Sequence, residues 1–216
     1  MENNRIAFGW PFFQKVPVIG ILRGIALSDV MQILPLCITS GLKTIEITMN
    51  SSGAEDIIKQ AVKKFGESIN IGAGTVCNLQ DLDLALKAGA SFIVSPNLDE
   101  QVITKCVSND IPVFPGAFTP TEIYKAWDLG ATMVKVFPAD TLGPKFISNL
   151  KAPYSNIKLL PTGGIDATNV REFFKAGASG VGVSGGLFDQ KLIAHKQWDL
   201  LSQHLQEFSA QLETKN

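Results

Sequence analysis

Two ionisable residues stand inside otherwise apolar stretches of the 216-residue chain. Lys135 lies in the run ATMVKVFPAD, residues 131–140, and Glu46 lies in TIEIT, residues 44–48. Short apolar runs of this kind are typical of buried β-strands. The lysine and the glutamate are therefore each predicted to point either into a core or into a pocket.

A buried lysine can serve as a nucleophile because burial disfavours the charged ammonium and lowers its pKa. An ordinary lysine has a pKa of about 10.4, and lowering it to roughly 7 costs about 4–5 kcal/mol. A use that fits such a cost is attack of the Lys135 amine on a carbonyl carbon, which gives a Schiff base. Glu46 would then be a carboxyl proton shuttle beside it. The structural alternative is a buried ion pair, which stabilises a fold little once desolvation is counted.

Composition and charge exclude several other classes of protein. The net charge of −1 gives no electrostatic reason to expect nucleic acid or a membrane surface as a partner, and no apolar run approaches about 20 residues. The N-terminal residues do not form a secretory signal. The three scattered cysteines and two histidines show no metal-ligand spacing. We expect a cytoplasmic protein with reduced cysteines and neither a metal nor another cofactor.

The fold is predicted from eight short apolar runs that alternate with helical patterns. The expected strands are 17–22, 43–48, 70–73, 92–95, 111–114, 132–137, 157–160 and 180–184. Capping signals place helices between them, beginning at or just after Ser28-Asp29, Ser51–Gly53, Asn78, Asp99, Thr119-Pro120 and Asp166. Apolar parallel strands separated by helices indicate an α/β protein, and eight units favour a (β/α)₈ TIM barrel over an open doubly wound sheet. We expect one domain over residues 1–216, with an extra N-terminal helix in 1–16 and a single C-terminal helix over 189–212.

The active site of such a barrel lies at the carboxyl ends of its strands. Glycine pairs follow the seventh and eighth strands, where barrels often bind phosphate: Gly163-Gly164, and Gly185-Gly186 after Ser184. Arg23 follows the first strand and is a candidate for a carboxylate. The other strand ends contribute Asn50, Thr75, Pro96, Phe137 and Thr162. Glycine pairs are also ordinary turn residues, and Arg23 could equally form a rim salt bridge.

The motifs GILRGI, TIEITMNS, IGAGTV, IVSPNLD, PVFPGAFTPTE, VKVFPA and LLPTGGI together resemble one family of enzymes. It is the family of 2-keto-3-deoxy-6-phosphogluconate (KDPG) and 4-hydroxy-2-oxoglutarate (KHG) aldolases. The resemblance implies a metal-free class I aldolase on a (β/α)₈ barrel, with a homotrimer as its assembly. It implies Lys135 as the Schiff-base lysine and Glu46 as the general acid/base. It assigns Thr75, Pro96, Phe137 and Thr162 to the pyruvate half of the substrate, and Gly163, Gly164, Ser184 and Gly185 to the phosphate.

The chain departs from the well-known KDPG aldolases at Asn50, where those enzymes carry an arginine. An asparagine there is more similar to the related 2-keto-3-deoxy-6-phosphogalactonate (KDPGal) aldolases, and Arg23 is a candidate to hold the substrate carboxylate instead. The expected substrate is a phosphorylated keto acid, KDPG, with KHG as a second substrate and KDPGal as the alternative. A non-catalytic sugar-phosphate-binding protein is the hypothesis from another class. That protein would keep the glycine loops without needing both Lys135 and Glu46.

Overall fold

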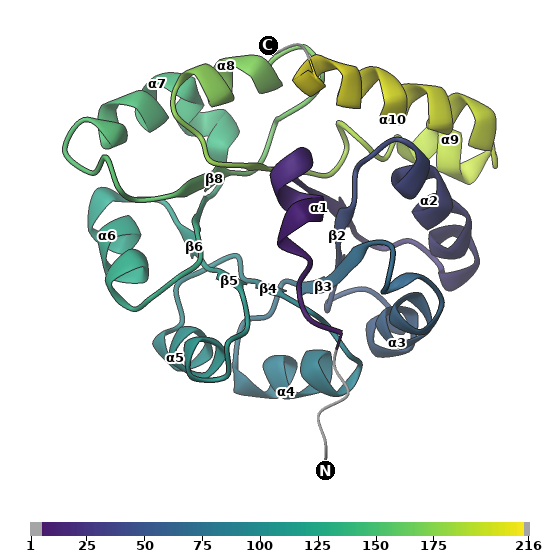
Figure 1. Ribbon diagram of the computed structural model, residues 1–216, viewed down its shortest axis with the longest axis horizontal. Helices are drawn as coiled ribbons and strands as arrows, with labels where there is room; N and C mark the ends of the chain where they lie inside the picture. The colour runs from purple at the N-terminus through teal and green to yellow at the C-terminus, as the bar shows by residue number, and fades with distance from the viewer. Residues whose placement is uncertain (1–5, 214–216) are drawn as a thin grey trace.

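The computed structural model describes residues 6–213, in which parallel strands alternate with helices. Viewed along the shortest axis of the molecule, the strands surround the centre and the helices lie outside them (Figure 1). The strands are β1 (Val18–Leu22), β2 (Thr44–Thr48), β3 (Asn70–Gly74), β4 (Ile93–Val94), β5 (Val113–Phe114), β6 (Gly116–Ala117), β7 (Val134–Val136), β8 (Leu159–Pro161) and β9 (Val181–Val183). Each predicted run therefore contains a strand, which makes the chain a parallel α/β protein.

The strands form two hydrogen-bonded sheets, in the orders β5-β4-β3-β2-β1-β9 and β6-β7-β8. Only Pro115 separates β5 from β6 along the chain. At the other junction, Thr162 after β8 forms a parallel bridge with Gly182 of β9. The last strand also pairs with the first, with Ile19 opposite Gly182. An open doubly wound sheet does not bring its first and last strands together in this way.

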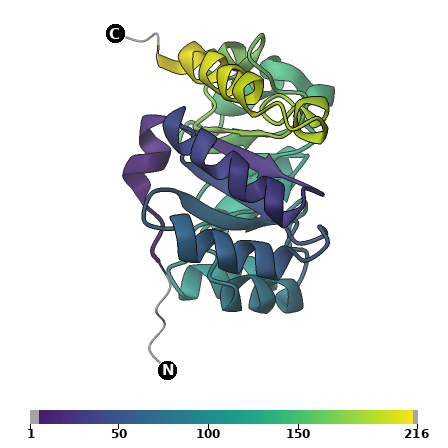
Figure 2. The same cartoon turned by 90° about the vertical axis from the view of Figure 1, so that its right-hand side faces the viewer.

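The helices between the strands are α2 (Leu27–Thr39), α3 (Ala54–Phe65), α4 (Leu79–Lys87), α5 (Glu100–Ser108), α6 (Pro120–Asp128), α7 (Ala139–Lys151) and α8 (Val170–Lys175). Four of them, α3 to α6, begin directly after their predicted capping residues, whereas α2 begins at Leu27, ahead of the predicted Ser28-Asp29. The side chains of Asn78 and Asp99 accept hydrogen bonds from the first turns of α4 and α5. Thr119 and Glu122 form a reciprocal capping box at the start of α6. Seen from the side, α2 and α3 lie against one flank of the strands (Figure 2).

Two predicted helix positions are wrong. The single C-terminal helix expected over 189–212 is two helices, α9 (Gln190–Ala194) and α10 (Trp198–Glu213), because the chain turns between them at Lys196, whose φ is 55°. Asp166 does not begin a helix. Its carboxylate instead accepts hydrogen bonds from the backbone N–H and hydroxyl of Thr168, and α8 begins four residues later at Val170.

The N-terminal helix expected within residues 1–16 is short. It is α1 (Trp10–Lys15), and the first five residues of that range lie outside the described residues. Figure 1 shows α1 over the centre of the strand assembly. The Phe13 ring of α1 is buried and lies 6.3 Å from the Phe114 ring, centroid to centroid. The helix therefore covers one end of the strand assembly.

An inner hydrophobic cluster fills the strand assembly at the end where α1 lies. It consists of Phe8, Phe13, Ile19, Phe92, Val94, Phe114, Met133 and Leu160. Phe92 and Met133 directly precede β4 and β7, Ile19 is the second residue of β1, and Phe13 comes from α1, so the cluster lies toward the amino ends of these strands. A larger cluster packs the outer faces of the strands against the helices. The carboxyl ends are thus the part of the interior that the inner cluster does not fill.

Within residues 6–213, no helix has both the length and the apolar character required to cross a bilayer.

Candidate active site

Lys135 and Glu46 both lie in the middle of strands and are almost completely buried. Lys135 is central in β7, with 5% of its surface exposed, and Glu46 is central in β2, with 1% exposed. The Lys135 ammonium nitrogen lies 5.0 Å from the centroid of the Phe137 ring. Within the described part of the chain, no ion pair joins Lys135 to Glu46 at 4 Å or less. The two side chains therefore influence each other through the electric field of their charges and not through a direct ion pair.

Burial acts on both groups in the direction that favours their neutral forms. Burial lowers the pKa of Lys135, the Glu46 carboxylate opposes that shift, and the Arg23 guanidinium adds to it. Burial also raises the pKa of Glu46, while Lys135 and Arg23 oppose the rise. An amine with a lowered pKa is a better nucleophile at neutral pH, and a carboxyl group with a raised pKa can donate a proton. The pair thus has the electrostatics of a nucleophile beside an acid/base group.

The Glu46 carboxyl group lies over the backbone of Gly74, the last residue of β3. A Cβ atom added to Gly74 would lie 2.2 Å from Glu46 Oε1, closer than any real Cβ contact. Glycine at this position therefore leaves the space that the carboxyl group occupies. The other oxygen, Oε2, is buried and accepts no hydrogen bond from any residue within 6–213. A buried carboxyl oxygen without a partner is costly unless the site uses it.

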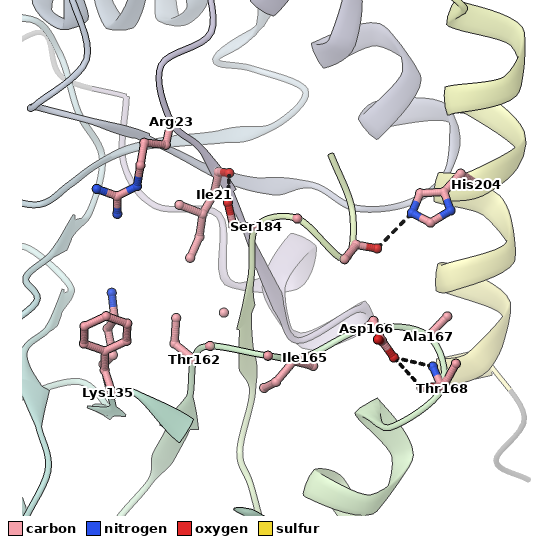
Figure 3. A pocket seen from close by; sticks show the side chains of 16 residues that line it. Ile21, Arg23, Lys135, Thr162, Ile165, Asp166, Ala167, Thr168, Ser184 and His204 are labelled. Atoms are coloured by element: carbon pink, nitrogen blue, oxygen red, sulfur yellow. Dashed lines mark hydrogen bonds between the residues drawn. The ribbon is translucent and has the colours of Figure 1, made fainter. Parts of the chain in front are cut away.

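A cavity of about 600 Å³ opens at the carboxyl ends of the strands, next to this pair. Eight of the residues predicted for the site line it: Arg23, Lys135, Phe137, Thr162, Gly163, Gly164, Ser184 and Gly185. Figure 3 shows Lys135 and Arg23 at one end of the cavity and Asp166, Thr168 and His204 at the other. The cavity is therefore long enough to hold a chain that reaches from the amine to the glycine loops.

The two glycine loops present free backbone donors to the cavity. Gly163 and Gly164 have φ angles of 109° and 64°, which side-chain-bearing residues rarely adopt. A Cβ atom added to Gly185 would meet nothing within 4 Å. No acceptor within residues 6–213 takes a hydrogen bond from the N–H groups of Gly164, Gly185 or Gly186. Free N–H groups in loops that line a cavity are suited to bind the oxygens of an anion.

Four predicted site residues do not line the cavity: Glu46, Asn50, Thr75 and Pro96. Glu46 still acts on Lys135 through its charge. Asn50 is connected through Arg23, whose Nη1 donates to Asn50 Oδ1 over 3.3 Å. Thr75 follows Gly74 with a φ of 57°, and the backbone carbonyl of Pro96 packs against Gly116.

Sequence reasoning missed several residues of the cavity, among them Asp166, Thr168 and His204. Asp166 and Thr168 belong to the turn that follows the first glycine pair, so their place in the chain was a usable signal. His204 comes from α10, near the C-terminus, and only the packing of α10 brings it to the cavity. Within residues 6–213, no three His, Cys, Asp or Glu side chains converge in an arrangement suited to a metal ion.

Comparison with known proteins identifies the family. A family model described as KDPG and KHG aldolase matches residues 12–204. The chain belongs to this aldolase family. The enzyme is therefore an aldolase, a carbon–carbon lyase.

Relatives of this aldolase bear the names of two epimeric substrates. The 2-dehydro-3-deoxy-6-phosphogalactonate aldolase of Escherichia coli K12 is 35% identical over 81% of this chain and 85% of its own. The 2-dehydro-3-deoxy-phosphogluconate aldolase of Haemophilus influenzae is 34% identical over 90% of this chain and 93% of its own. A solved structure described as native KDPGal is 32% identical, with a TM-score of 0.85 over 92% of this chain and 95% of its own. Family membership thus fixes the type of reaction and leaves the epimer open.

Proposed function

We propose that this aldolase is a class I enzyme that cleaves KDPG to pyruvate and glyceraldehyde 3-phosphate through a Schiff base on Lys135. The observation that carries the proposal is the pair formed by buried Lys135, at the end of a cavity, and buried Glu46, which acts on Lys135 through its charge. Burial lowers the pKa of the amine, so its neutral, nucleophilic form is favoured. The same pair supplies a carboxyl group whose raised pKa suits a proton donor.

The reaction begins when the Lys135 amine attacks the C2 carbonyl carbon of the keto acid. A carbinolamine forms, Glu46 protonates its hydroxyl group, and water leaves to give the protonated imine. Glu46, now a carboxylate, takes the proton of the C4 hydroxyl. The C3–C4 bond breaks, its electrons pass into the imine as an enamine, and C4 leaves as the aldehyde of glyceraldehyde 3-phosphate. Protonation of the enamine at C3 and hydrolysis of the imine release pyruvate and restore the amine.

The two ends of the substrate would be held by the two ends of the cavity. We propose that Arg23, positioned by Asn50, binds the C1 carboxylate near Lys135. Thr162 and Phe137, which line the cavity, would contact the pyruvate half. Thr75 and Pro96, which the family resemblance also assigns to that half, do not line the cavity. The N–H groups of the glycine loops, with Ser184, would bind the 6-phosphate.

KDPGal is the second candidate substrate, and Asn50 is the observation that favours it. An arginine at this position is usual in the well-known KDPG aldolases, and the Escherichia coli relative is named for the galactonate epimer. The two substrates differ only in configuration at C4. The values of kcat/KM for KDPG, KDPGal and KHG decide between these substrates. Each value can be measured with pyruvate release coupled to lactate dehydrogenase. A higher kcat/KM for KDPGal would replace the leading assignment.

Trapping the Schiff base tests the mechanism directly. Incubation with pyruvate followed by borohydride reduction should leave a stable adduct, which peptide mass spectrometry should locate on Lys135. Lys158→Ala serves as a control, because it removes another lysine of the same chain and should leave the adduct in place. An adduct on a different lysine, or none at all, would overturn the assignment of Lys135.

The non-catalytic alternative makes the opposite prediction for Lys135→Met. A sugar-phosphate-binding protein would keep its biological activity in this variant, whereas an aldolase that uses Lys135 would lose turnover. Binding of the phosphorylated ligand can be measured by calorimetry in the same variant. Turnover that is present in the wild type and lost in Lys135→Met, with ligand binding retained, would support the aldolase, and retained biological activity would support the sensor.

We also propose that the two sheets form one closed (β/α)₈ barrel and that residues 1–216 form a single domain. The short interruption at Pro115 and the bridge between Thr162 and Gly182 support closure. The homotrimer implied by the family resemblance is part of this proposal. Sedimentation equilibrium should give three times the mass of the 23.3 kDa chain. A monomer in that measurement would exclude the trimer and leave the catalytic proposal standing.

A further inference from the structure

His204 connects the last helix to the second glycine loop. It lies in α10 and lines the cavity at the end opposite to Lys135 (Figure 3). Its Nε2 lies 2.9 Å from the carbonyl oxygen of Gly186. A carbonyl oxygen can only accept a hydrogen bond, so Nε2 carries the hydrogen and donates it. Helix α10 is itself fixed, because Leu201, Leu205 and Phe208 are completely buried.

The loop that His204 contacts is held at several points along its backbone. At its start, the Ser184 hydroxyl donates to the carbonyl of Ile21. At its end, the N–H groups of Leu187 and Phe188 both donate to the Ser184 carbonyl. The peptide between Gly186 and Leu187 is therefore held on both sides, by Ser184 through its N–H and by His204 through its carbonyl. The N–H groups of Gly185 and Gly186 remain without an acceptor within residues 6–213.

The glycine at position 186 cannot be replaced by a larger residue that would stiffen the loop. An added Cβ atom would lie 2.2 Å from the carbonyl oxygen of Ile165, in the first glycine loop. The two loops thus touch at this point. A side chain at position 186 would clash there, so it cannot be used to restrict the backbone of the second loop. A hydrogen bond from outside the loop is a means of fixing it without filling that space.

We propose that His204 is a positioning residue for the substrate phosphate: its hydrogen bond to the Gly186 carbonyl fixes the loop so that the free N–H groups face the ligand. This inference rests on the proposed function, because it assumes that a phosphate occupies the glycine-loop end of the cavity. His204 acts through the loop and takes no part in bond cleavage. Its removal should therefore weaken binding of phosphorylated substrate and leave the chemistry at Lys135 unchanged.

The test compares a phosphate-dependent with a phosphate-independent measurement. In His204→Ala, the KM for the phosphorylated keto acid should rise about two- to tenfold, the effect of one hydrogen bond, with kcat unchanged. The pyruvate concentration that gives half-maximal borohydride trapping of Lys135 should stay the same. In His204→Gln, the side-chain amide can donate to the same carbonyl, and the KM should return toward the wild-type value.

His195→Ala is the matched control, because the other histidine of the chain bonds only within its own helical turn, to the Lys191 carbonyl. It should leave both measurements unchanged. An unchanged KM in His204→Ala, or an equal rise in His195→Ala, would overturn the proposal. Failure of the glutamine to restore KM in a folded variant would also overturn it and indicate direct contact between a charged ring and the phosphate. Loss of pyruvate trapping in the wild type would instead overturn the proposed function itself.

Discussion

In the proposed mechanism, Lys135 and Glu46 together meet a requirement of protonation that neither residue could meet alone. A Schiff base requires a neutral amine, and its formation also requires a proton for the departing water. Burial favours the neutral amine and the neutral acid together. In water at pH 7, an ordinary lysine and glutamate would both be charged, which is the wrong protonation state for either role. The apolar strands around the pair therefore belong to the proposed mechanism as much as the two side chains do.

Replacement of the acid/base group should slow the reaction without removing the nucleophile. Glu46→Gln keeps the size of the side chain and loses its proton. We expect kcat to fall about 10²- to 10⁴-fold, the usual contribution of a positioned acid/base group. Steady-state kinetics measures this fall, and borohydride trapping with long incubation should still modify Lys135. A Glu46→Gln enzyme with the wild-type rate would remove Glu46 from the mechanism.

Removing the negative charge of Glu46 and removing the positive charge of Arg23 should shift the pH dependence of imine formation in opposite directions. The amine attacks only when neutral, so the rate rises with pH through the pKa of Lys135. The Glu46 carboxylate favours the ammonium and raises that pKa, while the Arg23 guanidinium disfavours it. Glu46→Gln should therefore shift the midpoint to lower pH, and Arg23→Gln should shift it to higher pH. Timed incubations with saturating pyruvate, quenched with borohydride, give each midpoint; shifts in the same direction would contradict this account.

Strand β3 contributes to the site by the absence of a side chain. Gly74 leaves room for the Glu46 carboxyl group, and an alanine there would force that group to move. We expect Gly74→Ala to lower kcat at least tenfold, because displaced catalytic groups lose much of their effect. If the loss of kcat arises only because the Glu46 carboxyl group is displaced, a double-mutant cycle should show it. The Gly74→Ala/Glu46→Gln variant should be no slower than Glu46→Gln alone. Additive losses would show that Gly74 acts on something else.

The elements that sequence predicted well are those in which local pattern and tertiary context agree. The run predicted as a strand over 43–48 became β2, Thr44–Thr48, one residue shorter at its start. The helix at 54–65 carries acidic residues in its first turn, lysines in its last and a glycine after it. Helix α7 was not predicted, since Gly143 and Pro144 within it have the composition of a turn, and Gly143 is indeed non-helical. The break near Lys196 was missed because its positive φ has no glycine to signal it.

The residues of the candidate site also differ in whether the local sequence pattern is enough to predict them. Lys135 and Glu46 were predictable because a charged residue in an apolar strand is conspicuous by itself. His204 was not, because its role depends on a contact with Gly186, 18 residues earlier, which the packing of α10 creates. Thr75 and Pro96 stand at strand ends as predicted, yet they do not line the cavity, because being at a strand end does not determine where a residue faces. Position along the chain predicts which end of the molecule a residue reaches and says less about its neighbours there.

At the scale of the whole molecule, stability and chemistry are placed at opposite ends of the strands. The inner cluster of Phe8, Phe13, Phe92 and Phe114 fills the end under α1, and the cavity opens at the other. Removal of a buried phenylalanine leaves a cavity that costs about 3–5 kcal/mol. We therefore expect Phe13→Ala to lower the free energy of unfolding by about that amount, as measured by urea denaturation.

The same variant should leave the chemistry intact, because Phe13 packs against the rings of Phe8 and Phe114, which belong to the inner cluster and not to the predicted site. At a temperature where the variant is folded, kcat should stay within about twofold of the wild-type value. Gln14→Ala is the control on the same helix, since Gln14 is exposed and its loss should cost less than about 0.5 kcal/mol. A large fall in kcat for folded Phe13→Ala would mean that the packing under α1 also fixes the positions of Lys135 and Glu46. The two ends of the strands would then be coupled.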